Sequence, residues 1–540
     1  AEPPTHHRHH RHHQTHRTGG VPARSTHRST ARSMLRWAVL INAAAAATYA
    51  DDPGCGCHNL NSDWGTKKMF ERGYAASLKH RADDLKELRE RSKQTLSAKE
   101  LKKAMSEELW ASLRRYRNAP ITSTKEAEAE AEVIKVLGEK MANRDVVLVL
   151  NNRVYVHREF YDRSKHPGHA VMVREAAQLL GVPNVIYDFA SETAGAAGCN
   201  KRPIKLSINK ELGYDQCGIM VPNSYFGNGN GNLTLWGNEN REQDAKLIPF
   251  AKRVPKALYR GSLHPDPENL FTNREACSRV AFGNYARIQA FASSFDHPHE
   301  VDAKCTTGHN GSCILPPPSC IGIVEDFNSG LKNKTDVGGK YLDDEHYRNH
   351  KYLLNLPGAA SGSYSKNLNH LWRTGAVVMQ WVHPFVEWYH PALQHGWTHL
   401  DVSRFSVAEY VKALEADPAT AQRLGANARF VHDTLLCPKC LAEFLKETFE
   451  ALNTHLGQHL ILDDGRRLSK LLREHGDCAT WAEVDQFKGH NTLPRLLAED
   501  DPIHPCRKGG PIANKNWQRD HDAMVQRLKQ AQAVGIEKRR

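Results

Sequence analysis

Two stretches of the chain alternate short apolar runs with amphipathic helical patterns. In the first stretch, "VVLVL" and "NVIYDF" flank the helical pattern "AVMVREAAQLLG". In the second, "KALYRGS", "YLLNL" and "GAVVMQW" alternate with further helical patterns between residues 256 and 455. Strands that alternate with helices in this way are typical of βαβ units and parallel sheets. We therefore predict an α/β protein with two parallel-sheet domains.

The connections between these runs give more specific predictions. In "VVLVLNNRVYVH" we expect two short strands with Asn151-Asn152 as their turn. The segment 223–240 is rich in Gly and Asn and predicts a loop, whereas "PFVEWYHPAL" predicts a helix. Helices are also expected near 273–292 and from about 406 to 455.

A chain of 540 residues is too long for a single hydrophobic core, which indicates two domains with extensions. Its 40% of hydrophobic and 8% of aromatic residues are ordinary for a globular protein. A charged helical pattern at 67–117 precedes the first domain. The predicted parts are a low-complexity leader with a signal or anchor segment (1–50), a helical region (51–143), the first domain (144–256), the second domain (257–455, with an inserted loop at 304–340), and a basic C-terminal extension (456–540).

The N-terminal region differs from the rest of the chain in composition. Residues 1–36 contain one acid, Glu2, among many Arg and His, and such a segment cannot form a core and is expected to be disordered. A short apolar stretch near 37–50 follows, with the layout of a secretory signal or a short membrane anchor. We favour entry into the secretory pathway, with the endoplasmic reticulum or Golgi lumen or the cell exterior as destination. An organelle transit peptide is the alternative, because the leader is rich in Arg and Ser.

Twelve cysteines are spread along the chain, which fits several disulfides in an oxidising compartment. Cys437-Pro-Lys-Cys440 has no second pair nearby, so a zinc ribbon is poorly supported. N-glycosylation tripeptides at Asn232, Asn310 and Asn333 are compatible with the same compartment, although such tripeptides also occur by chance.

The segment that follows "YLLNL" is rich in small residues. It is "PGAASGSYSK", and it leads into a helical pattern. Ligands bind at the carboxyl ends of parallel strands, where small residues let backbone amides approach an anion and the next helix points its positive end at it. Serine hydroxyls and Lys366 add donors and a positive charge. The alternative is a flexible turn capped by Ser, and the segment lacks the Gly-Lys-Ser/Thr ending of a Walker loop.

The longest motif resembles glycosyltransferase family 90, the group of the Rumi-type protein O-glucosyltransferases and the fungal capsule-associated xylosyltransferases. That motif is "HKYLLNLPGAASGSYSKNLNHLWRTGAVVMQWVHPFVEWYHPAL". Shorter motifs support it, namely "NNRVYVHREF", "VPNVIYDF" and "ALYRGS" before it and "LDVSRFSVAEYVKAL" after it. The resemblance covers roughly residues 145–455.

The resemblance implies a GT-B fold, in which two Rossmann-like domains face a cleft and the second one binds a sugar nucleotide. It also implies inverting transfer of glucose or xylose from a UDP-sugar to a hydroxyl of a protein or glycan, with no metal or other cofactor required. A small-residue loop before a helix N-terminus, together with fixed cations, suits the leaving diphosphate. Inverting transfer further needs a base for the acceptor hydroxyl.

The resemblance assigns the base to Asp188, which otherwise would only cap the turn or helix after its strand. The family pattern continues with Pro where this chain has Ala190. Lys366 stands where the family has Arg, and lysine keeps the charge but loses the bidentate geometry. Glu387 would contact the donor ribose from the start of a helix, or would stabilise that helix alone. The complete set of expected donor-binding residues is Ser262, Arg274, Ser361, Gly362, Ser363, Tyr364, Ser365, Lys366 and Glu387.

Two other functions remain open. A catalytically impaired pseudoenzyme that binds a sugar nucleotide or a glycan is compatible with Lys366 and Ala190. A nucleic-acid-binding protein is suggested by the net charge of +12, but the positive excess lies in the leader and the tail rather than on one basic face. We therefore expect no nucleic acid among the partners.

Two groups of residues have the side chains of metal ligands, but their positions in the sequence do not favour a metal site. The acidic run at 343–345 precedes the long motif and fits a solvated loop better. His383, His395 and His399 are scattered and lack the spacing of metal ligands.

Overall fold

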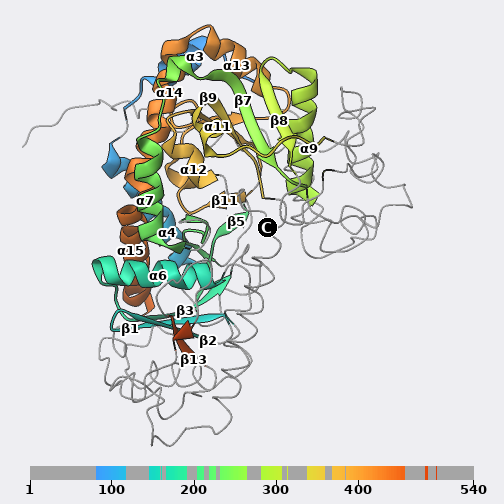
Figure 1. The fold of residues 1–540 in the computed structure, drawn as a ribbon. Helices are drawn as coiled ribbons and strands as arrows, with labels where there is room; N and C mark the ends of the chain where they lie inside the picture. Colours follow the sequence, from blue (N-terminus) through green and yellow to red (C-terminus); the bar gives the residue numbers. More distant parts are fainter. Residues whose placement is uncertain are drawn as a thin grey trace, which may run out of the picture. The chain divides into compact units, whose positions relative to one another are not determined.

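The structure is a computed structural model, and all the residues it describes belong to the unit Asp52–Arg540. Within these residues the strands form three sheets, with helices between them (Figure 1). The chain is therefore a mixed α/β protein, as predicted. The described residues are 81–95, 97–116, 145–157, 160, 166–190, 204–211, 218–226, 231–263, 281–306, 313, 337–358, 368–383, 385–456, 481–484 and 494–495.

One sheet is parallel throughout. Its strands are β7 (Val254–Gly261), β8 (Val301–Cys305), β9 (His350–Asn355), β10 (Val377–Trp381) and β12 (Leu400–Val402). Every neighbouring pair is parallel, in the spatial order β8-β7-β9-β10-β12. Numbered along the chain, that order is 2-1-3-4-5, a common arrangement of doubly wound sheets. The prediction of a parallel α/β unit in the second half of the chain is confirmed.

Helices cover both faces of this parallel sheet. Ala257 and Tyr259 of β7 belong to one core cluster, together with side chains of α9 (Ala281–Asp296) and α13 (Val407–Glu415). Leu258 belongs to a second cluster, together with side chains of α12 (Leu368–Arg373). Because successive residues of a strand point to opposite faces, α9 and α12 lie on opposite sides of the sheet. Helix α14 (Pro418–Val431) contributes to both clusters.

A mixed sheet contains the strands of the first half. They are β1 (Val146–Leu150), β2 (Arg153–His157), β3 (Val185–Ala190), β4 (Lys205–Ser207) and β6 (Ile219–Met220). Strands β1 and β2 form the predicted hairpin. Asn151 and Asn152 at its turn have φ values of 51° and 61°, as the two central residues of a type I′ turn require.

The prediction that this sheet would be parallel is wrong. Strand β1 is antiparallel to both β2 and β3, whereas β3–β4 and β4–β6 are parallel pairs. The hairpin reverses the chain before α6 (His166–Leu180) begins. Helix α6 therefore connects β2 to β3, which run in the same direction with β1 between them. Strands and helices alternate along the chain in a fully parallel sheet and in this mixed sheet alike, so the sequence pattern did not distinguish the two.

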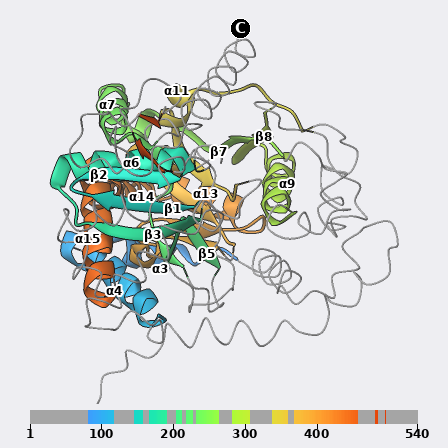
Figure 2. The same ribbon diagram turned by 90° about the horizontal axis from the view of Figure 1, so that it is seen from below.

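Two strands from the C-terminal region extend the mixed sheet. Strand β13 (Trp481–Val484) pairs with β2, and β14 (Pro494–Arg495) pairs with β13. Helix α15 (Pro438–Leu456) packs against α6 (Figures 1 and 2). The segment expected as an extension thus supplies part of a sheet, and its terminal helical pattern lies outside the described residues.

The charged pattern before the first domain forms helices α3 (Leu85–Ser92) and α4 (Ala98–Arg114). Ser97 and Glu100 form a capping box that starts α4. The α4 residues that pack into the core lie on one face, as expected for an amphipathic helix: Leu101, Met105, Leu109 and Leu113. No helix among the described residues is long and apolar enough to cross a membrane, and the leader and the stretch near 37–50 lie outside them.

The segment 223–240 is only partly the loop that its composition predicted. Helix α7 (Leu233–Asp244) begins inside it, so the prediction is wrong from residue 233 onward. The Asn232 side chain accepts a hydrogen bond from the backbone N–H of Leu235 at 2.8 Å, and Trp236 is buried. Asn is a favourable N-cap, and the burial of Trp236 favours the helix over a solvated loop.

The stretch "PFVEWYHPAL" does not form the predicted helix. Strand β11 (Phe385–Glu387) pairs antiparallel with β5 (Asn209–Glu211), and a short 3₁₀ turn, His390–Ala392, follows. The aromatic residues suit either a buried helix or a strand. Pairing with β5, which is more than 170 residues earlier in the chain, selects the strand.

Two disulfides lie among the described residues, Cys305–Cys313 and Cys437–Cys440. They support the prediction that cysteines of this chain are oxidised. The Cys437–Cys440 bond also gives the CxxC motif a role other than zinc binding.

Candidate functional site at the carboxyl edge of the parallel sheet

The strand order of the parallel sheet reverses between β7 and β9. These neighbours are hydrogen-bonded to each other, but the chain proceeds from β7 to β8 on one side and from β9 to β10 on the other. In doubly wound sheets, ligands bind in the crevice outside the carboxyl ends of the strands at this switch point. Ser262 leaves β7 here, and Leu356-Pro357-Gly358 leaves β9 toward the small-residue segment. A ligand site is thus expected where the small-residue segment follows β9, the same segment that the sequence indicates as an anion-binding candidate.

Arg287 of α9 joins the two loops at this switch point. Its Nε donates to the carbonyl oxygen of Pro357 at 3.1 Å, and its Nη1 donates to the carbonyl oxygen of Ser262. The side chain is buried, and its guanidinium lies 5.9 Å from the ring centroid of Tyr259. A buried cation with a fixed fork of donors sets the spacing between the starts of both loops.

Asn355 is the last residue of β9 and is only 1% exposed. Neither its side-chain oxygen nor its nitrogen has a hydrogen-bond partner among the described residues. Buried amides are nearly always paired, because an unpaired one loses its hydration without compensation. Asn355 therefore marks a place where a ligand, a water or a neighbouring loop supplies polar partners.

Neither Arg287 nor Asn355 was among the site residues expected from the sequence. A polar residue at the end of the apolar run "YLLNL" was the available indication of Asn355. Arg287 had no local indication, because its role depends on contacts with residues 25 and 70 positions away.

Of the expected donor-binding residues, Ser262 lies at the switch point and is partly buried. The neighbouring Arg260 forms an ion pair with Asp302 of β8, with 2.8 Å between Nη2 and Oδ2. This guanidinium therefore links β7 to β8. Apart from Glu387, the other expected residues of this set lie outside the described residues: Arg274, Ser361, Gly362, Ser363, Tyr364, Ser365 and Lys366.

Glu387 is buried at the end of β11, and the prediction that it starts a helix is wrong. Its Oε2 accepts a hydrogen bond from Nδ2 of Asn223 at 2.9 Å. Asn223 in turn accepts a hydrogen bond from Nδ2 of Asn369, the second residue of α12, at 3.3 Å. Glu387 thus belongs to a buried polar network that reaches the helix following the small-residue segment.

Asp188 lies within β3 and is partly exposed. Its Oδ2 is 3.2 Å from Nζ of Lys205, the residue opposite it in the neighbouring strand β4. The geometry supplies a carboxylate that is held beside an ammonium group across the β3–β4 pair.

The histidines and the acidic run form structural contacts. His383 follows β10 and its Nδ1 accepts a hydrogen bond from the N–H of Phe385 at 3.1 Å, while burial lowers its pKa to about 3. His395 bonds Asp83 at 2.6 Å, and Asp343 caps α11 (Asp344–Arg348). Within the part of the chain that the structure describes, no group of three or more His, Cys, Asp or Glu is placed to hold a metal ion.

The chain matches no family model, and no curated protein matches it. The resemblance to glycosyltransferase family 90 therefore rests on the motifs quoted above, and the activity is a proposal.

Proposed function

We propose that this protein is an inverting glycosyltransferase that moves glucose or xylose from a UDP-sugar to a hydroxyl of a protein or glycan. The switch point between β7 and β9 carries the proposal, because the small-residue segment follows β9 and Arg287 holds the start of that segment beside Ser262. Doubly wound sheets bind nucleotides at such positions. The buried amide of Asn355, which has no hydrogen-bond partner among the described residues, supports a polar ligand at the same edge.

In the proposed reaction, Asp188 takes the proton of the acceptor hydroxyl as its oxygen attacks the anomeric carbon of the sugar. The bond from that carbon to the diphosphate oxygen breaks, and UDP leaves with the bonding electrons on the opposite face. Arg274 and Lys366 would offset the charge on the diphosphate, and Glu387 would accept a hydrogen bond from the ribose. All these groups belong to the protein, so the proposed step needs no metal.

Thermal unfolding of the full chain with UDP tests the donor site. A ligand that binds only the folded state stabilises it, by about 2.7 kcal/mol at a concentration a hundred times its Kd. We expect millimolar UDP to raise the midpoint and uridine to raise it less. No shift with UDP, with or without divalent ions, would contradict the donor site.

Release of UDP from UDP-glucose and UDP-xylose, with water as a slow acceptor, tests the transfer itself. The better donor should be the one hydrolysed faster. A protein that binds UDP but hydrolyses neither sugar nucleotide, and transfers to no protein or glycan acceptor, would fit the second candidate, a pseudoenzyme that binds sugar nucleotides. Lys366 and Ala190, which stand where the family has Arg and Pro, favour this candidate, and Asp188 is engaged by Lys205 at 3.2 Å.

We also propose that the protein works in the secretory pathway or outside the cell. The Cys305–Cys313 and Cys437–Cys440 disulfides are compatible with an oxidising compartment. Asn232 is buried and caps α7, so in the folded protein it is a poor acceptor for a glycan. Peptide mapping of protein from a secretory host should find this asparagine unmodified. A membrane anchor and an organelle transit peptide stay predictions that concern residues outside the described ones.

A further inference from the structure

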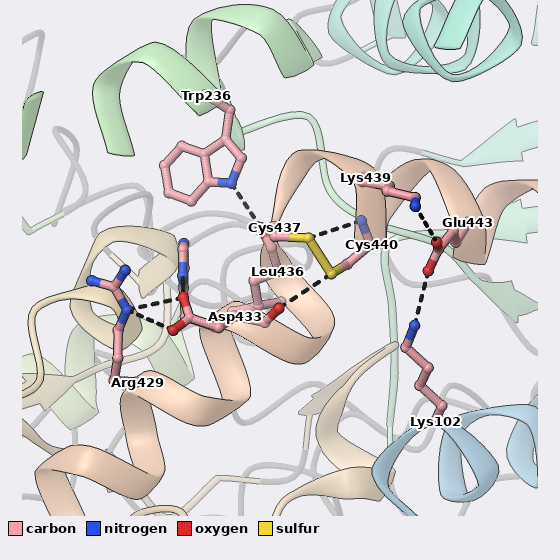
Figure 3. The surroundings of a disulfide bond; sticks show 10 residues. Lys102, Trp236, Arg429, Asp433, Leu436, Cys437, Lys439, Cys440 and Glu443 are labelled. Atoms are coloured by element: carbon pink, nitrogen blue, oxygen red, sulfur yellow. Dashed lines mark hydrogen bonds and ion pairs between the residues drawn. A yellow bond between two sulfur atoms is a disulfide. The ribbon is translucent and has the colours of Figure 1, made fainter. Parts of the chain in front are cut away.

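The Cys437–Cys440 disulfide lies at the N-terminus of α15, a helix of 19 residues (Figure 3). Cys437 occupies the N-cap position, since its carbonyl oxygen accepts the N–H of Leu441 at 2.9 Å. Its Sγ accepts the backbone N–H of Cys440 at 3.1 Å. The sulfur thus takes the place of the side-chain oxygen of an ordinary N-cap.

We propose that Cys437 and Cys440 form a redox-active pair that exchanges with external monothiols. This proposal is independent of the proposed glycosyl transfer. It rests on the hydrogen bond to the Cys437 sulfur, on the exposure of the pair and on the size of the ring that the disulfide closes.

The hydrogen bond favours the reduced form with a thiolate at Cys437. The amides at a helix N-terminus and the helix dipole stabilise a negative charge there. Cysteines at helix N-termini and in CxxC motifs are accordingly more reactive than ordinary thiols. Sγ of Cys440 lies 3.5 Å from the carbonyl oxygen of Asp433, which can accept the proton of the thiol after reduction. Both sulfurs of the reduced pair therefore have polar partners.

The two disulfides of the described residues differ in exposure and in ring size. Cys437 and Cys440 are partly exposed, whereas Cys305 and Cys313 are buried. The sequence separation is 3 residues for Cys437–Cys440 and 8 for Cys305–Cys313. The constraint that a disulfide places on the unfolded chain grows with the logarithm of the loop it closes. The Cys437–Cys440 disulfide thus constrains the unfolded chain less than Cys305–Cys313 does, and it is the more accessible of the two.

The backbone around the pair is held by contacts that do not involve the disulfide. The indole N–H of Trp236 donates to the carbonyl oxygen of Leu436 at 2.7 Å, and Arg429 forms an ion pair with Asp433 at 2.9 Å (Figure 3). These contacts fix the residues immediately before Cys437. The two sulfurs should therefore stay close after reduction, which allows the bond to form again.

The exchange proceeds by two thiolate attacks. An external thiolate forms a bond to Sγ of Cys440, and the disulfide breaks with its electron pair on Sγ of Cys437, the sulfur that the helix stabilises. A second external thiolate attacks the external sulfur of this mixed disulfide and releases Cys440. Two external thiols are oxidised to one disulfide, and the protein gains two electrons. Cys440 takes one of the two protons, and the other goes to the solvent while Cys437 remains a thiolate.

The proposal that Cys437 and Cys440 exchange with external thiols is tested by equilibrating the native full chain in glutathione buffers. The ratio of reduced to oxidised glutathione increases from one buffer to the next. Free thiols are alkylated at each step, and peptide masses give the reduced fraction of each cysteine. We expect Cys437 and Cys440 to become reduced together while Cys305 and Cys313 remain oxidised, and to reoxidise when oxidised glutathione is added. If both pairs resist reduction until the protein unfolds, or if both are reduced at the same buffer composition, the proposal is wrong.

A pair of single variants tests the role of the N-cap. Cys440→Ser leaves Cys437 at the helix N-terminus, and Cys437→Ser leaves Cys440 in the first turn. Both variants are treated at pH 6 with the aromatic disulfide of thionitrobenzoate. Cys437 in the Cys440→Ser variant should react about tenfold faster than Cys440 in the Cys437→Ser variant, because a larger fraction of Cys437 is thiolate. Equal rates, or a faster Cys440, would overturn the assignment of Cys437 as the stabilised thiolate. The glutathione titration of the unchanged protein gives an answer even if a variant does not fold.

Discussion

Nε of Arg287 donates a hydrogen bond to the carbonyl oxygen of Pro357 at 3.1 Å, although 70 residues separate them. The contact connects helix α9 to the point where the chain leaves β9. The same guanidinium binds the carbonyl oxygen of Ser262, so one buried side chain positions two loops at the switch point of the parallel sheet. A site built in this way depends on Arg287 for its shape even if Arg287 touches no ligand.

Arg287→Met should lower both stability and UDP binding. The change leaves the buried carbonyl oxygen of Pro357 and the partly buried one of Ser262 without a charged donor, which should cost about 3 kcal/mol in the free energy of unfolding. Arg89→Met is a matched control, because Arg89 forms an exposed ion pair with Asp417 and should cost less than about 1 kcal/mol. Urea unfolding measures the stabilities of the two variants. An Arg287→Met protein as stable as Arg89→Met would show that the two hydrogen bonds contribute little.

Asp188→Asn should strongly lower turnover while leaving donor binding almost intact. If Asp188 is the base, UDP-sugar turnover should fall by roughly a hundred- to ten-thousand-fold, with the loss in kcat rather than in the KM for the donor. Asp343→Asn makes the same chemical change at an exposed helix cap and should leave turnover unchanged. Hydrolysis of UDP-glucose or UDP-xylose measures the effect. Equal rates for Asp188→Asn and the unchanged protein would remove Asp188 from the mechanism.

Lys366→Ala should weaken UDP binding, because it removes a positive charge from the small-residue segment. Lys366→Arg should preserve or improve the affinity, since a guanidinium can bind a phosphate through two hydrogen bonds. Titration calorimetry with UDP compares the two variants directly. An Arg variant that binds much more weakly than the unchanged protein would indicate that Lys366 does not contact the diphosphate.

Glu387→Gln should separate a structural role from a ligand role. The amide oxygen of Gln can still accept the hydrogen bond of Asn223, so we expect a loss of at most about 1 kcal/mol in stability. If the carboxylate binds the ribose, loss of its charge should weaken UDP binding about tenfold, or roughly 1.4 kcal/mol. Calorimetry with UDP decides, and unchanged affinity would leave Glu387 with its structural contacts alone.

His383 should make the protein sensitive to acid. Burial lowers its pKa to about 3 in the folded state, whereas an unfolded histidine titrates near 6.5. Protonation therefore favours the unfolded chain, and the stability present above about pH 6.5 falls by up to about 1.4 kcal/mol per pH unit between 6.5 and 3.

His383→Asn removes this titration, and its Oδ1 can still accept the N–H of Phe385. Urea unfolding at pH 7 and pH 5 should show a smaller difference for the variant than for the unchanged protein. The difference should not vanish, because burial also lowers the pKa values of His370, His390 and His432. An identical difference in both proteins would mean that the pKa of His383 is not lowered by folding.

Several elements of this protein follow from its sequence alone. Asn151-Asn152 predicts a tight hairpin because Asn tolerates positive φ, and both residues have it. The apolar runs that became β7, β9 and β10 predict buried strands, and all three are strands of the parallel sheet. The position of the small-residue segment after β9 follows in the same way. In each case, residues that are close in sequence contain all the necessary information.

Only the tertiary structure decided the direction of β3, the conformation around Glu387 and the partners of Arg287. Strand β2 occupies one edge of β1, and β3 pairs antiparallel with the other edge rather than parallel beside β2. Phe385–Glu387 became a strand because β5 offered a partner, and Arg287 met two carbonyl oxygens from distant loops. Local patterns fix how a segment can bury its apolar face, but polar pairing between distant segments depends on which surfaces the folded chain brings together.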